Sequence, residues 1–362
     1  MYDRKTAFEY YNGKKVLVTG ASGFKGSWLV KMLLMAGAEV TGYALAPDTK
    51  PSLFELLGLN GETDRFSFIE GDVRDYGKLF KVFTETQPEI VFHLAAQPLV
   101  RRSYSEPRYT YETNVMGTVN VCECVRLCDS VRSFLNVTTD KVYLNRETME
   151  GYVENDPLDG FDPYSNSKSC SELVTHSYIN SFLKGLGKAV STARAGNVIG
   201  GGDFSEDRII PDGVRAACAG EALIIRNPES IRPYQHVLEP LSAYLMIAAA
   251  QDQDGSKAGY YNVGPDDCDC ITTGELVSLF EKHMGDGFSA EIRRDKNAPH
   301  EATLLKLDTS LIRKTFGWEP VWNIDDAVAK TAEWTKAWMK DDSTDAVNRI
   351  TESQIGSYLN LS

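Results

Sequence analysis

The chain has 362 residues, of which 42% are hydrophobic, and 38 Lys and Arg stand against 51 Asp and Glu, a formal net charge of −13 at pH 7. This length predicts about two domains, and the composition is that of a folded protein with a sizeable core. The acidic balance argues against general binding to nucleic acid or anionic membranes, but it does not exclude a small anionic ligand held by a few arginines.

Residues 1–5 lack the apolar stretch of a signal peptide, and no apolar run approaches the roughly 18–20 residues of a membrane span. The seven cysteines form no Cys-x-x-Cys pair and no cluster with histidine, so we predict reduced thiols and no metal site. These features predict a cytoplasmic protein with no membrane or nucleic-acid partner.

The first 195 residues alternate short β-rich runs with helical segments, the pattern of a parallel sheet covered by helices. Strands are predicted at 15–19, 39–44, 66–70, 89–94, 133–137 and 188–193. Helices are predicted at 24–36, 76–86, 113–128 and 163–183. The fold class predicted is α/β, with a Rossmann-type doubly wound parallel sheet.

Beyond residue 196 the pattern becomes shorter and more mixed. Three glycines at 200–202 open a loop, and Thr272 with Glu275 marks a helix start, with a Thr cap and an acidic first turn. We assign residues 1–195 to a nucleotide-binding domain, to which some later segments return, and 196–340 mainly to a smaller mixed α/β substrate lobe. The polar tail, 341–362, is predicted to be a loosely packed helix or partly disordered.

A glycine-rich loop joins the first predicted strand to the first predicted helix. It contains Gly20, Ser22, Gly23, Phe24, Lys25 and Gly26. Glycines there permit a tight turn, close approach of the backbone to a pyrophosphate and close helix–strand packing. The context favours a dinucleotide-binding loop over a plain turn, although its G-x-x-G-x-x-G spacing differs from the commonest G-x-G-x-x-G.

One feature expected of such a loop is missing. An acidic residue about 20 positions on normally holds the adenosine ribose, but Ala44 ends the second strand and no arginine marks a 2′-phosphate. Asp72 and Val73 follow the third strand, where they either face the adenine or form a turn in which Asp72 caps a helix. The loop therefore leaves the choice between NAD and NADP open.

Tyr164 and Lys168 stand near the start of the long predicted helix, and their i, i+4 spacing places both on one face. A phenol has a pKa near 10, and a base working near pH 7 needs a pKa about three units lower, some 4 kcal/mol. A neighbouring ammonium in a partly dehydrated cleft, aided by the positive charge of a nicotinamide, is a source of that change. Alone this spacing is common on solvated helices; the glycine loop upstream favours the catalytic interpretation.

Together these motifs resemble the short-chain dehydrogenase/reductase superfamily, in its extended branch acting on nucleotide sugars. The family places a Ser or Thr, here Thr139, at a strand end to hydrogen-bond the 4-hydroxyl of the sugar. In its 4,6-dehydratases the next two positions, here Asp140 and Lys141, carry the acid and base of water elimination. Lys141, where dTDP-glucose enzymes typically have Glu, makes the chain similar to the CDP-glucose 4,6-dehydratase family. Further matching segments lie at 23–28, 93–101, 113–118, 194–203 and 232–240, with Tyr234 where that family commonly has Trp.

The resemblance implies NAD as the cofactor and CDP-D-glucose as the small-molecule substrate. Tyr164 would take the proton of the 4-hydroxyl while the C4 hydride passes to NAD⁺. Asp140 and a neutral Lys141 would then act as acid and base in loss of water across C5–C6, and hydride would return to C6. The implied product is CDP-4-dehydro-6-deoxy-D-glucose, in the bacterial synthesis of 3,6-dideoxyhexoses for the lipopolysaccharide O-antigen.

The resemblance also implies two sets of binding residues. Beyond the loop named above, cofactor contacts are expected from Asp72, Val73, Leu94, Ala95, Ala96, Asn114, Tyr164 and Lys168. Substrate contacts are expected from Gln97, Arg101, Tyr104, Asn197, Arg208, Arg232 and His236. Family members usually dimerise through two long helices each, here 113–128 and 163–183, so a homodimer or higher homo-oligomer is expected.

Two alternatives remain open at this stage. A nucleotide-sugar 4-epimerase uses the same glycine loop, Thr139, Tyr164 and Lys168 but needs no Asp140–Lys141 pair. A catalytically silent NAD-binding regulator would share the fold, and the intact Thr139–Tyr164–Lys168 set argues against it.

Overall fold

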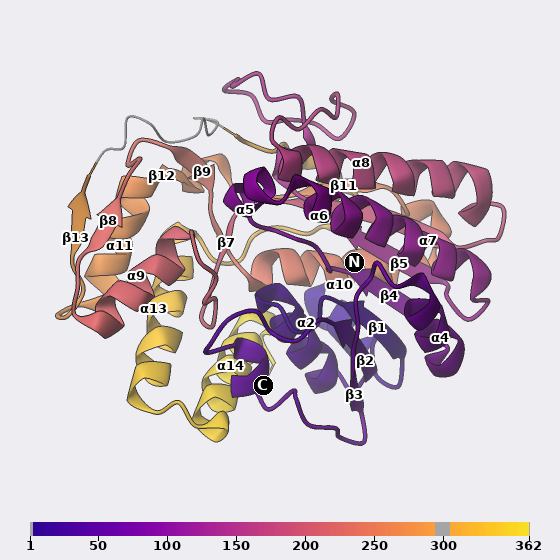
Figure 1. The fold of residues 1–362 in the computed structure, drawn as a ribbon, viewed down its shortest axis with the longest axis horizontal. Coiled ribbons are helices and arrows are strands. Elements are labelled where there is room, and N and C mark those ends of the chain that lie inside the picture. The colour runs from indigo at the N-terminus through magenta and orange to yellow at the C-terminus, as the bar shows by residue number, and fades with distance from the viewer. Residues whose placement is uncertain (1–2, 294–304, 362) are drawn as a thin grey trace.

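The centre of the molecule is a seven-stranded parallel sheet with the strand order β3-β2-β1-β4-β5-β6-β11 (Figure 1). The computed structural model describes residues 3–293 and 305–361. The strands are β1 (Lys15–Thr19), β2 (Glu39–Ala44), β3 (Phe66–Glu70), β4 (Ile90–His93), β5 (Ser133–Val137), β6 (Ala189–Ala195) and β11 (Tyr260–Val263). The predicted α/β class with a doubly wound parallel sheet is confirmed, and the first six strands lie within about two residues of their predicted bounds.

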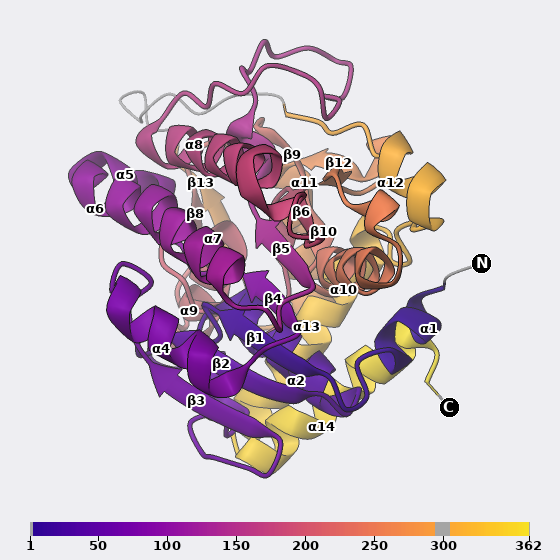
Figure 2. The ribbon, with the colours of Figure 1, turned by 90° about the vertical axis from the view of Figure 1, so that its right-hand side faces the viewer.

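Helices cover both faces of this sheet, as Figure 2 shows in side view. One face carries α1 (Arg4–Glu9), α2 (Phe24–Met35) and α10 (Leu238–Gln253); the other carries α4 (Tyr76–Thr86), α7 (Gly117–Leu127) and α8 (Pro163–Tyr178). In β1 the side chains of Val16 and Val18 enter the first core while Leu17 enters the second. This alternation explains why the strand sequences are almost continuously apolar, since both faces are buried.

Two of the long predicted helices begin or end in a π-helical turn. The segment predicted at 113–128 opens with such a turn at Glu112–Met116 before α7, and α8 continues into another at Ile179–Leu183. Three short helices between the strands were not predicted: α3 (Leu53–Leu56), α5 (Val100–Ser105) and α6 (Pro107–Tyr111). Each has four to six residues, too short to show a helical period in sequence.

The smaller lobe lies beside the carboxyl ends of the strands and has a core of its own, around Phe280 and Phe288. Its helices are α9 (Ile209–Ala219), α11 (Thr273–Met284) and α13 (Ile324–Lys340), and α12 (Ser310–Phe316) packs beside β11. Short two-stranded pairs complete it: β7 (Val198–Ile199) with β10 (Gln235–His236), β9 (Ile231–Pro233) with β12 (Cys270–Thr272), and β8 (Leu223–Ile225) with β13 (Ala290–Ile292). The predicted start of α11 is confirmed as a capping box, in which Thr272 and Glu275 bond each other's backbone N–H. The assignment of 196–340 to substrate binding stays a prediction.

The tail is a helix, as one of its two predictions stated, but it is neither loosely packed nor disordered over residues 344–359. Residues 344–359 form α14 (Thr344–Leu359), capped by Ser343, with Val347, Ile355 and Tyr358 buried against the main core. Tyr358 donates its hydroxyl hydrogen to Glu239 (2.7 Å). The buried positions recur at helical spacing among polar residues, so the mean polarity of the segment concealed an amphipathic helix.

Among the described helices none is long and apolar enough to cross a membrane. Within the same residues no group of three or more His, Cys, Asp or Glu side chains is placed to hold a metal ion, and the seven cysteines are free thiols.

Candidate active site

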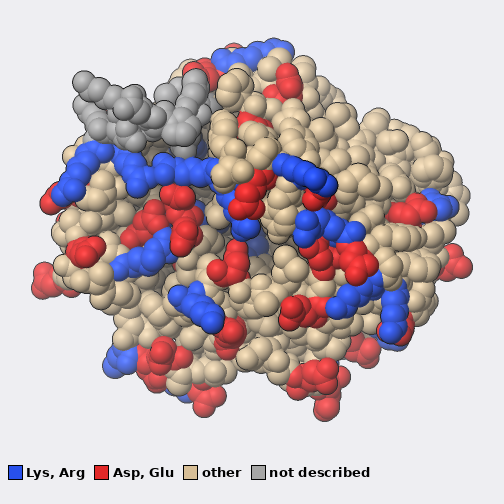
Figure 3. Space-filling view, viewed as in Figure 1, with Lys and Arg blue, Asp and Glu red and all other residues tan. Residues whose placement is uncertain are grey.

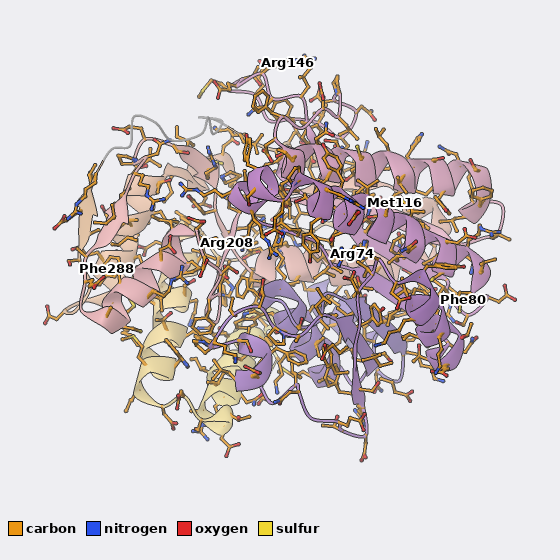
Figure 4. The ribbon with its side chains drawn as sticks, viewed as in Figure 1. Arg74, Phe80, Met116, Arg146, Arg208 and Phe288 are labelled. Atoms are coloured by element: carbon orange, nitrogen blue, oxygen red, sulfur yellow. The ribbon has the colours of Figure 1, made fainter. Side chains whose placement is uncertain are left out.

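A cavity of about 2350 Å³ opens at the carboxyl ends of the central strands, between the sheet and the smaller lobe. Its walls come from the loops after β1, β2, β4, β5 and β6 and from the start of α9 and the β8 region. Figure 3 shows acidic and basic side chains interspersed over this face of the molecule, and Figure 4 labels Arg208 between the two lobes. This is where ligands bind in open parallel sheets.

The glycine loop forms the floor of the cavity on the β1 side. Gly20 has φ +75°, and a Cβ there would lie 2.6 Å from the backbone N of Ala95. A Cβ on Gly26 would lie 2.1 Å from the carbonyl oxygen of Gly20. Gly23 is the N-cap of α2 and no side chain caps the first helical turn. The loop is thus a cradle without side chains, open toward the cavity, that suits an anion at a helix N-terminus.

The other predicted cofactor residues divide into those that line the cavity and one that supports it. Asp72, Val73, Leu94, Ala95 and Ala96 line it, together with Ser22, Phe24 and Lys25. Asp72 is held by Arg74, with Nη2 2.6 Å from Oδ2. Asn114 does not line the cavity: it accepts from the backbone N of Gln97 (2.8 Å), donates to its carbonyl (3.1 Å) and donates to Ser167 (2.9 Å). Asn114 therefore fixes the loop after β4 to α8.

Thr139, Asp140 and Lys141 form one hydrogen-bonded group just after β5. The Oγ1 of Thr139 donates to Oδ1 of Asp140 (2.9 Å), and Nζ of Lys141 lies 3.4 Å from the same oxygen. Thr139 and Lys141 line the cavity, whereas Asp140 is fully buried behind them. Among the described residues, Oδ2 of Asp140 has no hydrogen-bond partner.

Tyr164 and Lys168 project from the first turns of α8 toward this group, as their spacing predicted. Burial raises the pKa of Tyr164 to about 12, and a hydrogen bond with the Thr139 side chain opposes that rise. Burial lowers the pKa of Lys168 to about 8, and the negative charge of Glu172 opposes that fall. The ammonium of Lys168 donates to the carbonyl of Val137 (3.0 Å). The chain alone therefore holds Tyr164 as a phenol, and Lys168 titrates close to neutral pH.

Several cations converge on this part of the cavity. Burial lowers the pKa of Lys25 to about 7, and the positive charge of Arg208 is the second cause. The charges of Lys168 and Lys141 lower this pKa further, whereas the charge of Asp140 raises it. A bound anion would relieve this crowding.

The residues predicted for substrate binding lie mostly on the opposite wall. Arg232, Arg208, Asn197, Gln97 and Arg101 all line the cavity. Arg208 pairs with Asp203 (3.2 Å), and Arg101 pairs with Asp207 (3.1 Å) across the two lobes. Arg232 is 7% exposed, and its Nη1 donates to the carbonyl of Ile231 (2.9 Å). Guanidinium groups in such fixed positions are suited to a diphosphate.

Two of the predicted substrate contacts lie away from the cavity. Tyr104 is 47% exposed on α5 and is not part of the lining. His236 is fully buried between the rings of Trp28 and Trp322, at centroid distances of 6.0 and 4.8 Å, and burial lowers its pKa to about 3. The matching motif around residue 236 therefore reflects packing behind the cavity, and direct contact of His236 with a ligand is not supported by this geometry.

Sequence reasoning missed the carboxylates that hold these groups in place. Glu172 lies four residues after Lys168, so the helical spacing alone was a signal that it shares a face with the lysine. Asp203 and Asp207 pair with arginines from loops, and nothing in a single sequence announces such contacts.

The strand order and the Tyr164–Lys168 pair at the carboxyl edge of the sheet define a short-chain dehydrogenase/reductase of the extended kind. Residues 17–331 match the sequence profile described as GDP-mannose 4,6 dehydratase. The chain therefore belongs to the GDP-mannose 4,6 dehydratase family.

Individual relatives agree with this membership. The chain is 47% identical to a CDP-glucose 4,6-dehydratase of Salmonella typhimurium over 337 residues, covering 91% of this chain and 93% of the relative. Among solved structures it is similar in fold to an epimerase of Methanothermobacter thermautotrophicus (TM-score 0.80, 23% identity, covering 94% and 97%). It is also similar to a dTDP-glucose 4,6-dehydratase of Bacillus anthracis in complex with NAD (TM-score 0.75, 22% identity, covering 91% and 98%).

Proposed function

We propose that this protein dehydrates CDP-D-glucose to CDP-4-dehydro-6-deoxy-D-glucose. The observation that carries the proposal is that Thr139 and Lys141, both bonded to Asp140 buried behind them, face Tyr164 and Lys168 in one cavity. The 47% identity to a CDP-glucose 4,6-dehydratase supports the choice of substrate. The Asp140–Lys141 pair favours dehydration over epimerisation, because moving a hydride to and from C4 alone requires no acid and base at C5 and C6.

The cofactor is NAD, and the cavity fits a dinucleotide. The fit rests on the glycine loop at the start of α2, where Gly23 caps the helix without a side chain, and where Gly20 and Gly26 approach backbone atoms too closely for a Cβ. Asp72, Val73, Tyr164 and Lys168 also line the cavity. We assign the first two to the adenosine and the last two to the nicotinamide end of the cofactor. When bound, NAD would supply the hydride acceptor for C4 of the sugar and the hydride donor for C6.

The chain's own residues handle the protons of this reaction. The Oη of Tyr164, once it has lost its own proton, takes the proton of the 4-hydroxyl, and Thr139 hydrogen-bonds the 4-oxygen of the sugar. Once C4 is a ketone, the C5 proton is acidic, and Nζ of Lys141 removes it while Asp140 gives a proton to the departing 6-hydroxyl. One water leaves, and the C5–C6 double bond that forms is then reduced by a hydride at C6 and a proton at C5.

The nucleotide diphosphate is proposed to lie along the wall of the smaller lobe. Arg232 and Arg208 face the cavity there, and Asn197 lies between them and the catalytic group because it accepts from Nζ of Lys141 (3.1 Å). A few fixed guanidinium groups can bind a dianion in a protein whose net charge is −13.

We also propose that the protein forms a homodimer through α7 and α8. These neighbouring helices expose the apolar side chains Leu127 and Leu173, and Met116 and Phe182 lie exposed in the π-helical turns beside them. Apolar side chains gathered on adjacent helices are what a helix-to-helix contact between two copies would cover.

The proposed setting is the cytoplasm, in the synthesis of 3,6-dideoxyhexoses for the lipopolysaccharide O-antigen. It is supported by the family resemblance and by the chemistry of the product, since a 4-keto-6-deoxy sugar nucleotide is a suitable substrate for later removal of the 3-hydroxyl.

The decisive experiment is incubation of the purified protein and NAD⁺ with CDP-, UDP-, dTDP- and GDP-glucose in separate reactions, followed by mass spectrometry. We expect loss of one water from the CDP sugar and much slower loss from the other three. Appearance of an isomer of unchanged mass would indicate an epimerase, and water loss from another nucleotide in preference to CDP would reassign the substrate.

A further inference from the structure

A buried ion pair lies directly behind the catalytic residues. Glu172 of α8 and Arg194 of β6 are 1% and 2% exposed, and they meet in a two-point contact, with Nε 3.0 Å from Oε1 and Nη2 3.0 Å from Oε2. Two hydroxyls complete the coordination of the carboxylate: Thr138 donates to Oε1 (2.5 Å) and Thr192 to Oε2 (2.8 Å). Each carboxylate oxygen of Glu172 thus accepts two hydrogen bonds.

The guanidinium of Arg194 is turned away from the cavity. Its Nη1 donates to the hydroxyl of Tyr143 and to the backbone carbonyl of Glu154, both at 2.8 Å. Tyr143 in turn donates to Asn262 of β11 (2.6 Å). The guanidinium of Arg194 is therefore bonded to Tyr143 and Glu154 as well as to Glu172, whereas the carboxylate of Glu172 lies next to α8.

Glu172 follows Lys168 by one helical turn, so the two side chains share a face of α8. Lys168 itself donates to the carbonyl of Val137, the residue before Thr138. The carboxylate and the ammonium therefore approach the same end of β5 from one helix, with Thr138 bonded to the first and Val137 to the second.

Glu172 is the carboxylate that opposes the loss of charge at Lys168. The charge of Lys168 acts on Lys25 of α2 and on His93 of β4. Tyr164 precedes the lysine by one turn of α8, and Asp140 and Lys141 follow the end of β5, where Lys168 is bonded. Arg194 stands behind Glu172 on β6. The charge of Glu172 raises the pKa of Lys168 against the larger effect of burial, and the result, about 8, lies where a small change alters the charged fraction.

We propose that Glu172, held by Arg194, Thr138 and Thr192, is a positioning residue that keeps the ammonium of Lys168 charged beside Tyr164. The inference rests on the proposed function in that Tyr164 must lose a proton, and a neighbouring cation makes this easier. A buried ion pair is by itself weak support for a role in stability, because the cost of desolvating the two charges often exceeds their attraction. An electrostatic effect on Lys168 would explain the presence of this buried pair better than a contribution to stability.

The direct test measures the charge of Lys168 without substrate or cofactor. The intact protein is labelled briefly with an amine-acylating reagent over a series of pH values, and peptide mass spectrometry gives the midpoint of labelling at Lys168. In Glu172→Gln we expect the midpoint to fall by about one pH unit. In Arg194→Lys, which leaves both the carboxylate and a cation beside it, we expect no fall. Lys188, buried elsewhere and bonded to the carbonyls of Cys128 and Val131, is the internal control, and its midpoint is expected to stay constant.

The opposite behaviour of the two variants separates the proposal from a purely structural clamp. Loosening of the site would change Lys168 alike in both, so an equal fall in both variants overturns the proposal, as does an unchanged midpoint in Glu172→Gln. If Glu172→Gln does not fold because Arg194 is left unpaired, the labelling midpoint of Lys168 is measured instead in the double variant, Glu172→Gln with Arg194→Met. The midpoint of this double variant must then lie below that of Arg194→Lys.

Kinetics provide the second readout. In Glu172→Gln we expect the alkaline limb of the kcat profile to move to lower pH, with kcat at pH 8 reduced about three- to tenfold and KM nearly unchanged. Glu239→Gln, which removes a buried carboxylate of α10 bonded to Tyr358, is the matched control and is expected to keep the wild-type profile. A wild-type protein that fails to release water from CDP-glucose contradicts the proposed function, whereas the labelling result bears on Glu172 alone.

Discussion

Lys141 donates a hydrogen bond from Nζ to Oδ1 of Asn197 at 3.1 Å, joining the end of β5 to the segment that follows β6. The same Nζ lies 3.4 Å from Oδ1 of Asp140. The amine is thus fixed by a neutral amide on one side and a carboxylate on the other. This geometry directs Nζ along the cavity wall, between the catalytic group and the proposed diphosphate site.

Replacement of Lys141 by Met is expected to uncouple the two halves of the reaction. Oxidation at C4 needs Tyr164 and not Lys141, so reduced nicotinamide should form and persist at 340 nm, while water loss falls about a hundred- to ten-thousandfold. Stopped-flow absorbance and mass spectrometry measure the two steps. Lys81→Met, on the exposed face of α4, is the control. Unchanged turnover would remove Lys141 as the base.

Removal of the C5 proton should leave an isotopic record. A reaction run in deuterated water is expected to give product with deuterium at C5, because the proton taken from that carbon mixes with solvent before the carbon is protonated again. Proton NMR of the product reads the position directly. Product with only hydrogen at C5 would contradict elimination through this carbon.

The Arg101–Asp207 ion pair spans the mouth of the cavity, and both side chains are partly exposed, so it is expected to add little to stability. Asp207→Asn frees the guanidinium and removes one negative charge near the sugar nucleotide. We expect KM for the substrate to fall about two- to fivefold at low salt, with less effect at high salt and little change in Tm. Glu85→Gln, on a distant exposed pair, controls for net charge. A rise in KM would mean that the closed pair aids binding.

Glu239 should give stability a measurable pH dependence. Burial raises its pKa in the folded chain to about 7, against an ordinary value of 4.5. The folded state therefore binds this proton more tightly than the unfolded state, and the stabilisation is present below about pH 4.5 and is lost as pH rises to about 7. The full change is about 3 kcal/mol.

Urea unfolding at pH 5 and pH 8 tests this dependence. The free energy of unfolding of the wild type minus that of Glu239→Gln is expected to decrease by about 2–3 kcal/mol from pH 5 to pH 8. A constant difference would show that Glu239 has the same protonation in both states.

Most strands of the central sheet could be predicted because each is marked by residues within or next to the strand itself. β1, β4 and β5 are short apolar runs bounded by polar or turn residues, and the loop after β1 requires glycines at contacts too close for a Cβ. The position of β11 beside β6 was beyond such reasoning, because a strand from residue 260 joins the sheet only through contacts with distant segments.

The grouping of the candidate catalytic residues could be predicted for a similar reason, since Thr139, Asp140 and Lys141 are consecutive and Tyr164 and Lys168 share a helix face. The misplaced residues depended on tertiary packing. His236 sits in a matching motif but faces Trp28 and Trp322, and Tyr104 follows Arg101 by three residues yet points to solvent. Only the arrangement of the two lobes decides which side of each segment meets the cavity.

The first and last helices of the described chain pack together, with the guanidinium of Arg4 5.8 Å from the centre of the Tyr358 ring, and both ends lie on the same side in Figure 2. Side chains of α14 belong to the same core as those of β1 and α2. During synthesis this hydrophobic surface therefore stays partly uncovered until about residue 359 has left the ribosome. We expect the nascent chain to remain a client for chaperones until that moment, although its nucleotide-binding half is made first.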